Sequence, residues 1–180
     1  ADDRRAGEVI WRLRALFQRG EAKSELLDVE RLAREAVRML RSDFMTRNVT
    51  VTLDLARSLP PAQGDPVQLQ QVLLNLIVNG CEAMSSIAPR NRRLTVTTIE
   101  AGGEGVRVGV ADEGIGIAED DLERVFEPFY TTKTQGLGLG LSVCRRIINA
   151  HGGRLWADSN GAGGATFFFT LPNIDGRRAT

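Results

Sequence analysis

Residues 65–84 read DPVQLQQVLLNLIVNGCEAM and form the most informative segment of this sequence. An Asp followed by Pro is typical of a helix start, and the apolar residues after it predict a helix up to about residue 84. Two amides, Asn75 and Asn79, stand four residues apart and share a helix face, with Glu82 about one turn further. Burying an amide costs free energy unless it finds a partner, so these side chains either bond to strands and buried water or face a ligand. A carboxamide oxygen is a hard ligand that suits Mg²⁺.

Hydrophobic periodicity predicts further helices and strands on both sides of this segment. Helices are expected at 1–19, at 28–41 with Asp28 as the cap, at 119–126 and at 139–151. Strands are expected at 49–55, 93–100, 106–112, 154–158 and 165–171. Because adjacent strands are joined by short loops, we expect an α/β (α+β) two-layer sandwich. It would hold a mixed, mostly antiparallel sheet with helices on one face, plus the N-terminal helix.

The charge balance excludes two classes of partner. The 23 Lys and Arg residues equal the 23 Asp and Glu residues, so nothing indicates a basic surface for nucleic acid or anionic lipid. No apolar run approaches the roughly 20 residues of a membrane span. The two cysteines, Cys81 and Cys144, lie in apolar, helical contexts, which predicts two buried, reduced thiols. A reducing, cytoplasmic setting fits this pattern best.

A first glycine motif follows the strand expected at 106–112. The residues Asp112-Glu113-Gly114-Ile115-Gly116-Ile117 place a carboxylate at a strand end and two glycines directly after it. The glycines would let the backbone approach a planar ligand closely, while the carboxylate could accept a hydrogen bond from an exocyclic amine. A plain turn would have the same composition, so the motif alone leaves both interpretations open.

A second glycine motif, Gly136-Leu137-Gly138-Leu139-Gly140-Leu141, directly precedes a predicted helix. Bare backbone amides at a helix N-terminus form an anion site. The glycines are two apart throughout, which fits neither the GxGxxG motif of dinucleotide folds nor a GxxxxGK[ST] loop. The preceding Thr131, Thr132 and Lys133 add hydroxyls and an ammonium, as expected of a mobile lid over phosphates.

Three further features have competing explanations. Phe126-Glu127-Pro128-Phe129 either pins a loop to the core or anchors the base of the lid. Thr166 either places a hydroxyl near the base pocket or is a β-branched core residue. His151, the only histidine, lies at a helix end beside two glycines, where a cap or surface role is expected rather than catalysis or phosphorylation.

Taken together, these motifs resemble the catalytic and ATP-binding domain of sensor histidine kinases. That domain belongs to the ATPase superfamily shared with gyrase, Hsp90 and the mismatch-repair ATPases. The resemblance covers about residues 28–172. Residues 74–83 resemble the N box, 112–116 the G1 box, 126–129 the F box and 136–140 the G2 box.

The resemblance implies a role for each motif. Asn79 would bind Mg²⁺, with Asn75 and Glu82 supporting that site, and Asp112 would accept from the adenine amino group. Lys133 would act with Asn75 and Asn79 in catalysis. The residues expected around ATP are Asn75, Asn79, Glu82, Asp112, Gly114, Gly116, Ile117, Phe129, Thr131, Thr132, Lys133, Gly136, Leu137, Gly138, Leu139, Gly140, Leu141 and Thr166.

Two departures from the family pattern refine the expected function. Relatives that hydrolyse ATP carry Glu at the position of Asn75, and an amide cannot take a proton from water, so phosphotransfer is favoured over hydrolysis. No acceptor-histidine box is present. Residues 1–20 resemble the end of a dimerisation hairpin helix, 21–172 the ATP-binding kinase domain, and 173–180 a flexible tail.

The expected function is therefore transfer of the γ-phosphoryl group of Mg-ATP to a histidine on a separate hairpin. Relay to a response regulator would follow, and the parent protein would be a homodimer. Two alternatives remain: a serine kinase of the anti-sigma type with the same fold, and a nucleotide-sensing module without transfer activity.

Overall fold

The computed structural model of this chain describes residues 24–132, 136–160 and 163–173. The helix expected at 1–19, the hairpin end at 1–20, the side chain of Lys133 and most of the tail lie outside the described residues. Within them, no helix is both long enough and apolar enough to cross a membrane.

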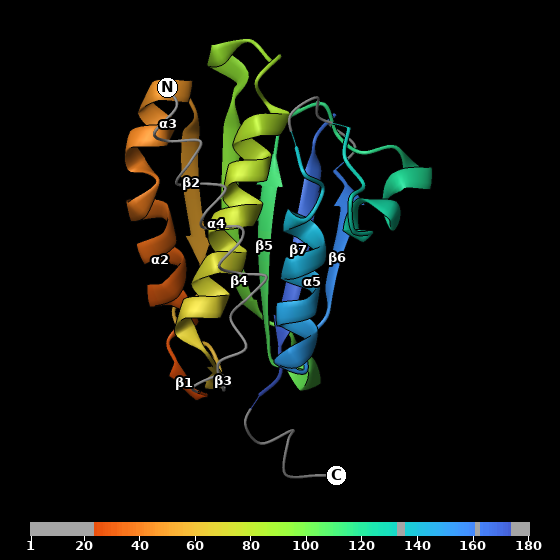
Figure 1. The fold of residues 1–180 in the computed structure, drawn as a ribbon. Helices are drawn as coiled ribbons and strands as arrows, with labels where there is room; N and C mark the ends of the chain where they lie inside the picture. The colour runs from red at the N-terminus through yellow and green to blue at the C-terminus, as the bar shows by residue number, and fades with distance from the viewer. Residues whose placement is uncertain (1–23, 133–135, 161–162, 174–180) are drawn as a thin grey trace.

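A five-stranded sheet forms one layer of the molecule (Figure 1). The strand pair at one edge is parallel and the other three pairs are antiparallel, so the sheet is mixed and mostly antiparallel, as predicted. In spatial order the strands are β2 (Thr50–Leu55), β4 (Arg93–Glu100), β5 (Val106–Asp112), β7 (Ala165–Leu171) and β6 (Leu155–Ser159).

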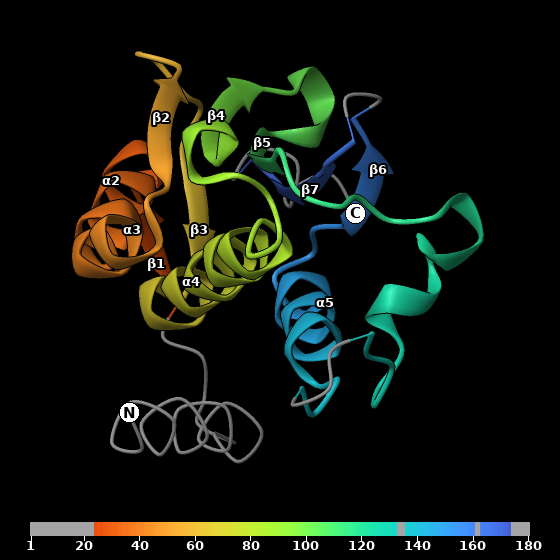
Figure 2. The ribbon, with the colours of Figure 1, turned by 90° about the horizontal axis from the view of Figure 1, so that it is seen from above.

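The helices form the second layer and cover one face of this sheet, which Figure 2 shows from above. They are α2 (Val29–Met39), α3 (Arg41–Arg47), α4 (Pro66–Ala83) and α5 (Gly140–Ala150). This arrangement confirms the two-layer sandwich. Alternate residues of the strands face the helices, so each strand contributes one row of apolar side chains to a shared core.

The central helix α4 begins where the sequence predicts. Asp65 is its N-cap, and the Oδ1 atom of Asp65 accepts from the backbone N–H groups of Val67 and Gln68 at 2.9 and 3.2 Å. Pro66 occupies the first helical position, where its missing N–H costs nothing. Five apolar side chains of α4 are completely buried against the sheet and α5: Leu69, Val72, Leu73, Leu76 and Ile77. Burying each stabilises the fold by about 2 kcal/mol, which makes α4 the centre of the core.

Two predicted helices differ from the structure, and one element of the structure was not predicted. The helix expected at 28–41 ends at Met39, and α3 follows it until Asn48, whose left-handed φ of 52° terminates the helix. The helix expected at 119–126 is two separate 3₁₀ turns, Glu119–Asp121 and Arg124–Phe126. A small antiparallel pair, β1 (Glu25–Leu27) with β3 (Ala62–Gly64), was not predicted.

Asn173, the first residue of the expected tail, is the last residue that the structure describes. Asn173 forms an antiparallel bridge with Ala62, beside the small β1–β3 sheet. Ala62 is fully buried, so this bridge extends the folded unit through residue 173.

His151 connects the two central helices. His151 is 5% exposed and is the C-cap of α5, so of the two expected roles the cap is confirmed and the surface position is wrong. Its Nε2 atom accepts from the backbone N–H of Asp65 at 3.0 Å, and its Nδ1 atom lies 2.8 Å from the carbonyl oxygen of Ile147. Because a backbone N–H can only donate, Nδ1 carries the ring hydrogen and donates to Ile147. The ring therefore ties the end of α5 to the start of α4.

Candidate functional site

Three elements meet at one end of the molecule. The second half of α4, the end of β5 and the start of α5 lie side by side there (Figure 1). Gly80 of α4 packs directly on Asp112 of β5, because a Cβ atom at Gly80 would lie 3.3 Å from the Asp112 Cβ. Asn79 and Glu82, both half-buried, flank this contact along α4. The first two predicted motifs are thus adjacent in space.

Asp112 is held in one orientation. Its side chain is 2% exposed, and its Oδ1 atom accepts from the backbone N–H of Gly114 at 2.8 Å. Its other oxygen, Oδ2, lies on the side of Gly80, 3.8 Å from the position of a Cβ there. Its backbone oxygen accepts from Asn160 Nδ2 at 2.8 Å. The carboxylate therefore has one oxygen committed to the turn and the other turned toward α4.

The glycine turn after Asp112 rests on the end of α4. A Cβ at Gly114 would lie 2.7 Å from the carbonyl oxygen of Ala83, which also accepts from the N–H of Ile115 at 3.3 Å. Gly116 has a left-handed φ of 74°, which disfavours any side chain. The turn therefore packs closely on the end of α4, and half-buried Ile117 leads the chain back to the core. The predicted close approach to a planar ligand stays a prediction.

Asn75 joins α4 to α5. Its side chain is 5% exposed, and its Nδ2 atom donates to the Sγ atom of Cys144 at 3.2 Å. A Cβ at Gly140, the first residue of α5, would lie 2.8 Å from Asn75 Oδ1. The absence of a side chain at Gly140 therefore makes room for the carboxamide, so both glycine motifs lie against α4.

The two ends of the predicted lid, at Phe129 and Gly138, lie next to each other and form its neck. The backbone N–H of Phe129 donates to the carbonyl oxygen of Gly138 at 2.8 Å, and Gly138 has a left-handed φ of 65°. A Cβ at Gly138 would lie 2.5 Å from the carbonyl carbon of Phe129, so only glycine fits. Thr131, Thr132 and Leu137 are exposed beyond this neck. Of the remaining G2 residues, Gly136, Leu139 and Leu141 are half-buried.

The two phenylalanines of the F box have different roles. Phe126 is buried, packs edge-on against Phe167 with the ring centres 6.1 Å apart, and lies under the Arg145 guanidinium. Phe126 thus pins its loop to the core, the first of the two roles expected for this motif. Phe129 is 75% exposed and has a left-handed φ of 68°, a conformation that is rare for a bulky residue. A strained aromatic at the lid neck points to a functional constraint.

Thr166 is on the wrong face of the sheet for the predicted role. It pairs with Ala111 and Asp158, whereas Asp112 pairs with Leu94 on the face that the helices cover. Side chains alternate along a strand, so Thr166 points away from the site and its neighbour Ala165, buried, points toward it. The sequence interpretation was one residue out of register.

Both cysteines are buried and unbonded to each other, which confirms the prediction of two core thiols. Burial raises the pKa of Cys81 to about 11 and that of Cys144 to about 12, so both remain protonated at neutral pH. The Asn75 amide beside Cys144 acts in the opposite direction and lowers its pKa, but less strongly than burial raises it.

Two contributors to the site were not predicted. Asn160 bonds to the backbone of Asp112 and accepts from the N–H of Gly164 at 3.0 Å, and Cys144 bonds to Asn75. Their partners are 48 and 69 positions away, so no local pattern could reveal them.

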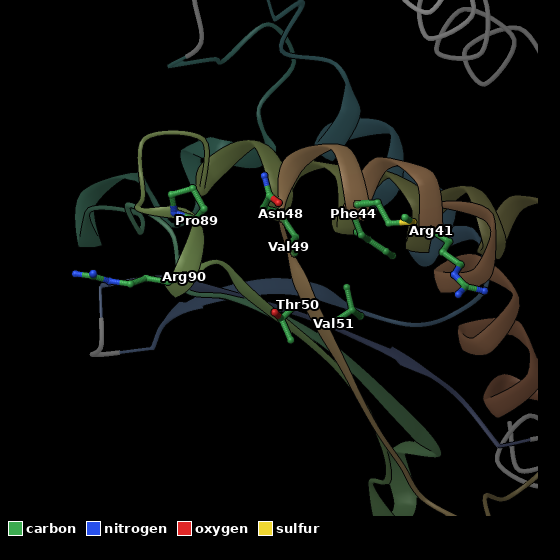
Figure 3. Close-up of a pocket in the computed structure, with 9 residues that line it drawn as sticks. Arg41, Phe44, Asn48, Val49, Thr50, Val51, Pro89 and Arg90 are labelled. Atoms are coloured by element: carbon green, nitrogen blue, oxygen red, sulfur yellow. The ribbon is translucent and has the colours of Figure 1, made fainter.

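A separate hollow lies outside this site. It has a volume of about 640 Å³ and opens between α3, the start of β2 and the turn at Pro89 and Arg90 (Figure 3). Phe44 and Val49 form its apolar floor, while Arg41 and Arg90 lie at opposite ends. It contains none of the residues that the sequence motifs identified.

The family model for histidine kinase-, DNA gyrase B- and HSP90-like ATPases matches residues 64–174, more than half of the chain. The chain belongs to this ATPase family. The match contains the N box helix, both glycine motifs and the F box, and the fold described above carries them in the order expected for the family.

Curated relatives of this ATPase domain are sensor proteins. The sensor protein FixL of Bradyrhizobium diazoefficiens is 42% identical over 171 residues, which are 95% of this chain and 34% of FixL. The sensor histidine kinase TmoS of Ectopseudomonas mendocina is 35% identical over 172 residues, 95% of this chain and 18% of TmoS. The chain thus spans about a third or less of these relatives.

Solved structures share the fold of this ATPase domain. The catalytic domain of histidine kinase ThkA superposes with a TM-score of 0.74 at 32% identity, over 86% of this chain and 97% of that one. Full-length ShkA in complex with AMPPNP superposes with a TM-score of 0.76 at 28% identity, over 92% of this chain and 34% of ShkA. ThkA in complex with the response regulator TrrA has a TM-score of 0.78 at 26% identity, over 96% of this chain and 48% of that one.

Proposed function

We propose that this chain binds Mg-ATP and transfers its γ-phosphoryl group to a histidine on a separate dimerisation hairpin, for relay to an aspartate of a response regulator. The observation that carries the proposal is the junction at α4, where Asp112 packs on Gly80 and Asn75 packs on Gly140. These contacts bring a buried carboxylate, two amides and a glycine-rich helix start to one end of the fold.

The residues present fit a purine triphosphate. Asp112 keeps one oxygen on the side of α4, where it can accept from the exocyclic amine of adenine. At α5, the N–H groups of its first turn lack partners within the helix, and the N-cap Leu139 supplies no side-chain bond. A helix start of this kind binds anions. The likeness to ShkA, solved with AMPPNP, supports the same ligand class here.

The residues also fit Mg²⁺. Asn79 offers a hard carboxamide oxygen on the same face of α4 as Asn75. When bound, the ion neutralises charge on the phosphates and holds them in line for transfer. Asn79 would hold it, with Asn75 and Glu82 beside it, and Lys133 would add a positive charge from the lid.

The side chain at position 75 favours transfer over hydrolysis. A carboxamide cannot remove a proton from water, so no general base for hydrolysis is present at Asn75. The acceptor imidazole nitrogen would bond to the γ-phosphorus while the bond to the bridging oxygen breaks and ADP leaves. Catalysis would then rest on positioning and charge neutralisation. TmoS and ThkA are named histidine kinases, which supports histidine as acceptor, and the ThkA complex with TrrA supports a response regulator as partner.

The setting of the reaction is part of the proposal. We place the domain in the cytoplasm, where ATP is available and two buried thiols remain reduced, and we expect the parent protein to be a homodimer through its hairpin. No nucleic-acid partner is proposed, because the net charge is zero.

The chemical stability of the phosphorylated product tests the proposal. This chain is incubated with γ-³²P-labelled ATP, Mg²⁺ and a hairpin fragment carrying the acceptor histidine, and the labelled hairpin is then treated with acid or alkali. Label that is lost in acid and kept in alkali identifies phosphohistidine and supports the proposal. Label that survives acid and is lost in alkali indicates a serine kinase. Nucleotide binding without label indicates a sensing module, and either result overturns the proposed transfer.

A further inference from the structure

The buried contact between Asn75 and Cys144 sets how the Asn75 amide is turned. Cys144 is 2% exposed on α5 and Asn75 is 5% exposed on α4, so the 3.2 Å contact from Nδ2 to Sγ lies in the core. Sulfur is a weak acceptor, but a buried NH₂ group with a weak hydrogen bond is lower in free energy than one without any partner. The thiol is the partner that the described residues give to Nδ2.

The oxygen end of the Asn75 amide lies beside the start of α5. The Oδ1 atom lies closest to Gly140, whose Cβ position would be 2.8 Å away, while the Nδ2 atom would be 3.0 Å from that point. Among the described residues, none donates a hydrogen bond to Oδ1. Oδ1 is nevertheless not one of the completely buried side-chain atoms that lack a partner, so it is not fully enclosed. Oδ1 is therefore partly accessible, beside the start of α5.

The direction of this amide matters for a cation. An amide presents either a carbonyl oxygen, which attracts Mg²⁺, or an NH₂ group, which repels it. The thiol of Cys144 remains protonated at neutral pH because burial raises its pKa, so it is a neutral partner for the NH₂ end.

We propose that Cys144 is a positioning residue for the nucleotide site: its sulfur holds the NH₂ end of Asn75 and thereby turns the carbonyl oxygen toward Mg-nucleotide. Gly140 completes the cradle, because its missing side chain leaves room for the oxygen. This inference rests on the proposed Mg-ATP binding. It assigns to Cys144 a task in that site which no sequence motif contains.

The first test measures binding of Mg-AMPPNP, and of AMPPNP with EDTA, by calorimetry. Cys144→Ala removes the acceptor of the Asn75 NH₂ group. We expect Mg-AMPPNP to bind about tenfold more weakly, as for one lost hydrogen bond, and the affinity for AMPPNP in the presence of EDTA to change little. Cys144→Ser supplies a hydroxyl that accepts from the NH₂ group, and we expect affinity within about threefold of the parent chain.

A matched control separates positioning from general loss of stability. Val49→Ala removes buried apolar atoms at the separate hollow, which contains none of the motif residues. It should lower thermal stability much as Cys144→Ala does but leave both binding constants unchanged. Equal affinity of Cys144→Ala and the parent chain, or an equal loss with and without Mg²⁺, would overturn the proposed role.

A second readout does not depend on nucleotide. In the free chain, ¹⁵N NMR of the Asn75 side-chain NH₂ should show slow hydrogen exchange, faster exchange in Cys144→Ala and recovery in Cys144→Ser. If the parent chain fails to bind Mg-AMPPNP but this exchange pattern is found, the proposed function fails and the amide orientation stands. If exchange is the same in all three chains, the positioning role is refuted whatever the binding result.

Discussion

Replacing Asp112 by Asn keeps the shape of the side chain and changes one hydrogen-bonding group. Oδ1 of Asp112 accepts from the N–H of Gly114 at 2.8 Å, so the asparagine must place its oxygen there to keep that bond. Its NH₂ group then occupies the position of Oδ2, on the side of Gly80. A donor now faces the site where the adenine amine, also a donor, is expected.

The expected loss of affinity follows from this exchange. A hydrogen bond to a charged group contributes roughly 1.5–3 kcal/mol, which corresponds to roughly 10- to 150-fold in Kd. Solvent does not dilute the effect, because Asp112 is only 2% exposed. Since guanine presents an acceptor oxygen where adenine has the amine, the preference for adenine over guanine nucleotides should fall as well.

Calorimetry with Mg-AMPPNP and Mg-GMPPNP measures both effects. Asp158→Asn is the matched control, because Asp158 pairs with Thr166 on the opposite face of the sheet and bonds to Trp156 Nε1. Its affinity should equal that of the parent chain, and the melting temperature of Asp112→Asn should change little. Affinity of Asp112→Asn within threefold of the parent chain would refute the assignment of Asp112 to the base.

Four further predictions concern folding and the thiols. Asp65→Ala removes the cap of α4 and should destabilise the chain by about 1 kcal/mol in urea unfolding. His151→Ala should cost about 2–3 kcal/mol in the same assay, because it leaves a cavity and an unbonded N–H, and an effect below 1 kcal/mol would contradict the bridge. Native Cys81 and Cys144 should resist iodoacetamide at pH 8 and react after unfolding; alkylation of the native chain would show an open core. Their folded pKa values of about 11 and 12 exceed the ordinary value of 9.0, so the unfolded chain loses these protons first and stability falls as pH rises above 9. Between pH 8 and pH 10 the free energy of unfolding should fall by about 1 kcal/mol per thiol, a slope that Cys→Ala variants should lack.

Local signals in the sequence predicted most of the fold. The Asp65-Pro66 start of α4 and the bounds of β4, β5 and β7 follow from side-chain chemistry within a few residues of each position. The small β1–β3 sheet was missed because its strands have three residues each, too few for an alternating pattern to develop.

The site was predictable where it is built from motifs and unpredictable where tertiary packing decides. Asn75, Asp112 and Gly140 were identified by their types and spacing, and the structure brings them to the same helix. Thr166 was placed wrongly because a shift of one residue moves a strand side chain to the other face. Cys144 was taken only as a core residue, because its bond to Asn75 depends on how α5 packs against α4.

The location of bound nucleotide tests the central claim most directly. Backbone amide shifts of the ¹⁵N-labelled chain are followed by NMR during titration with Mg-AMPPNP. We predict that the largest changes fall at residues 75–84, 112–117 and 136–141, with little change around Arg41 and Arg90 in the separate hollow. Saturable changes centred on that hollow, or no changes at all at millimolar nucleotide, would contradict the account.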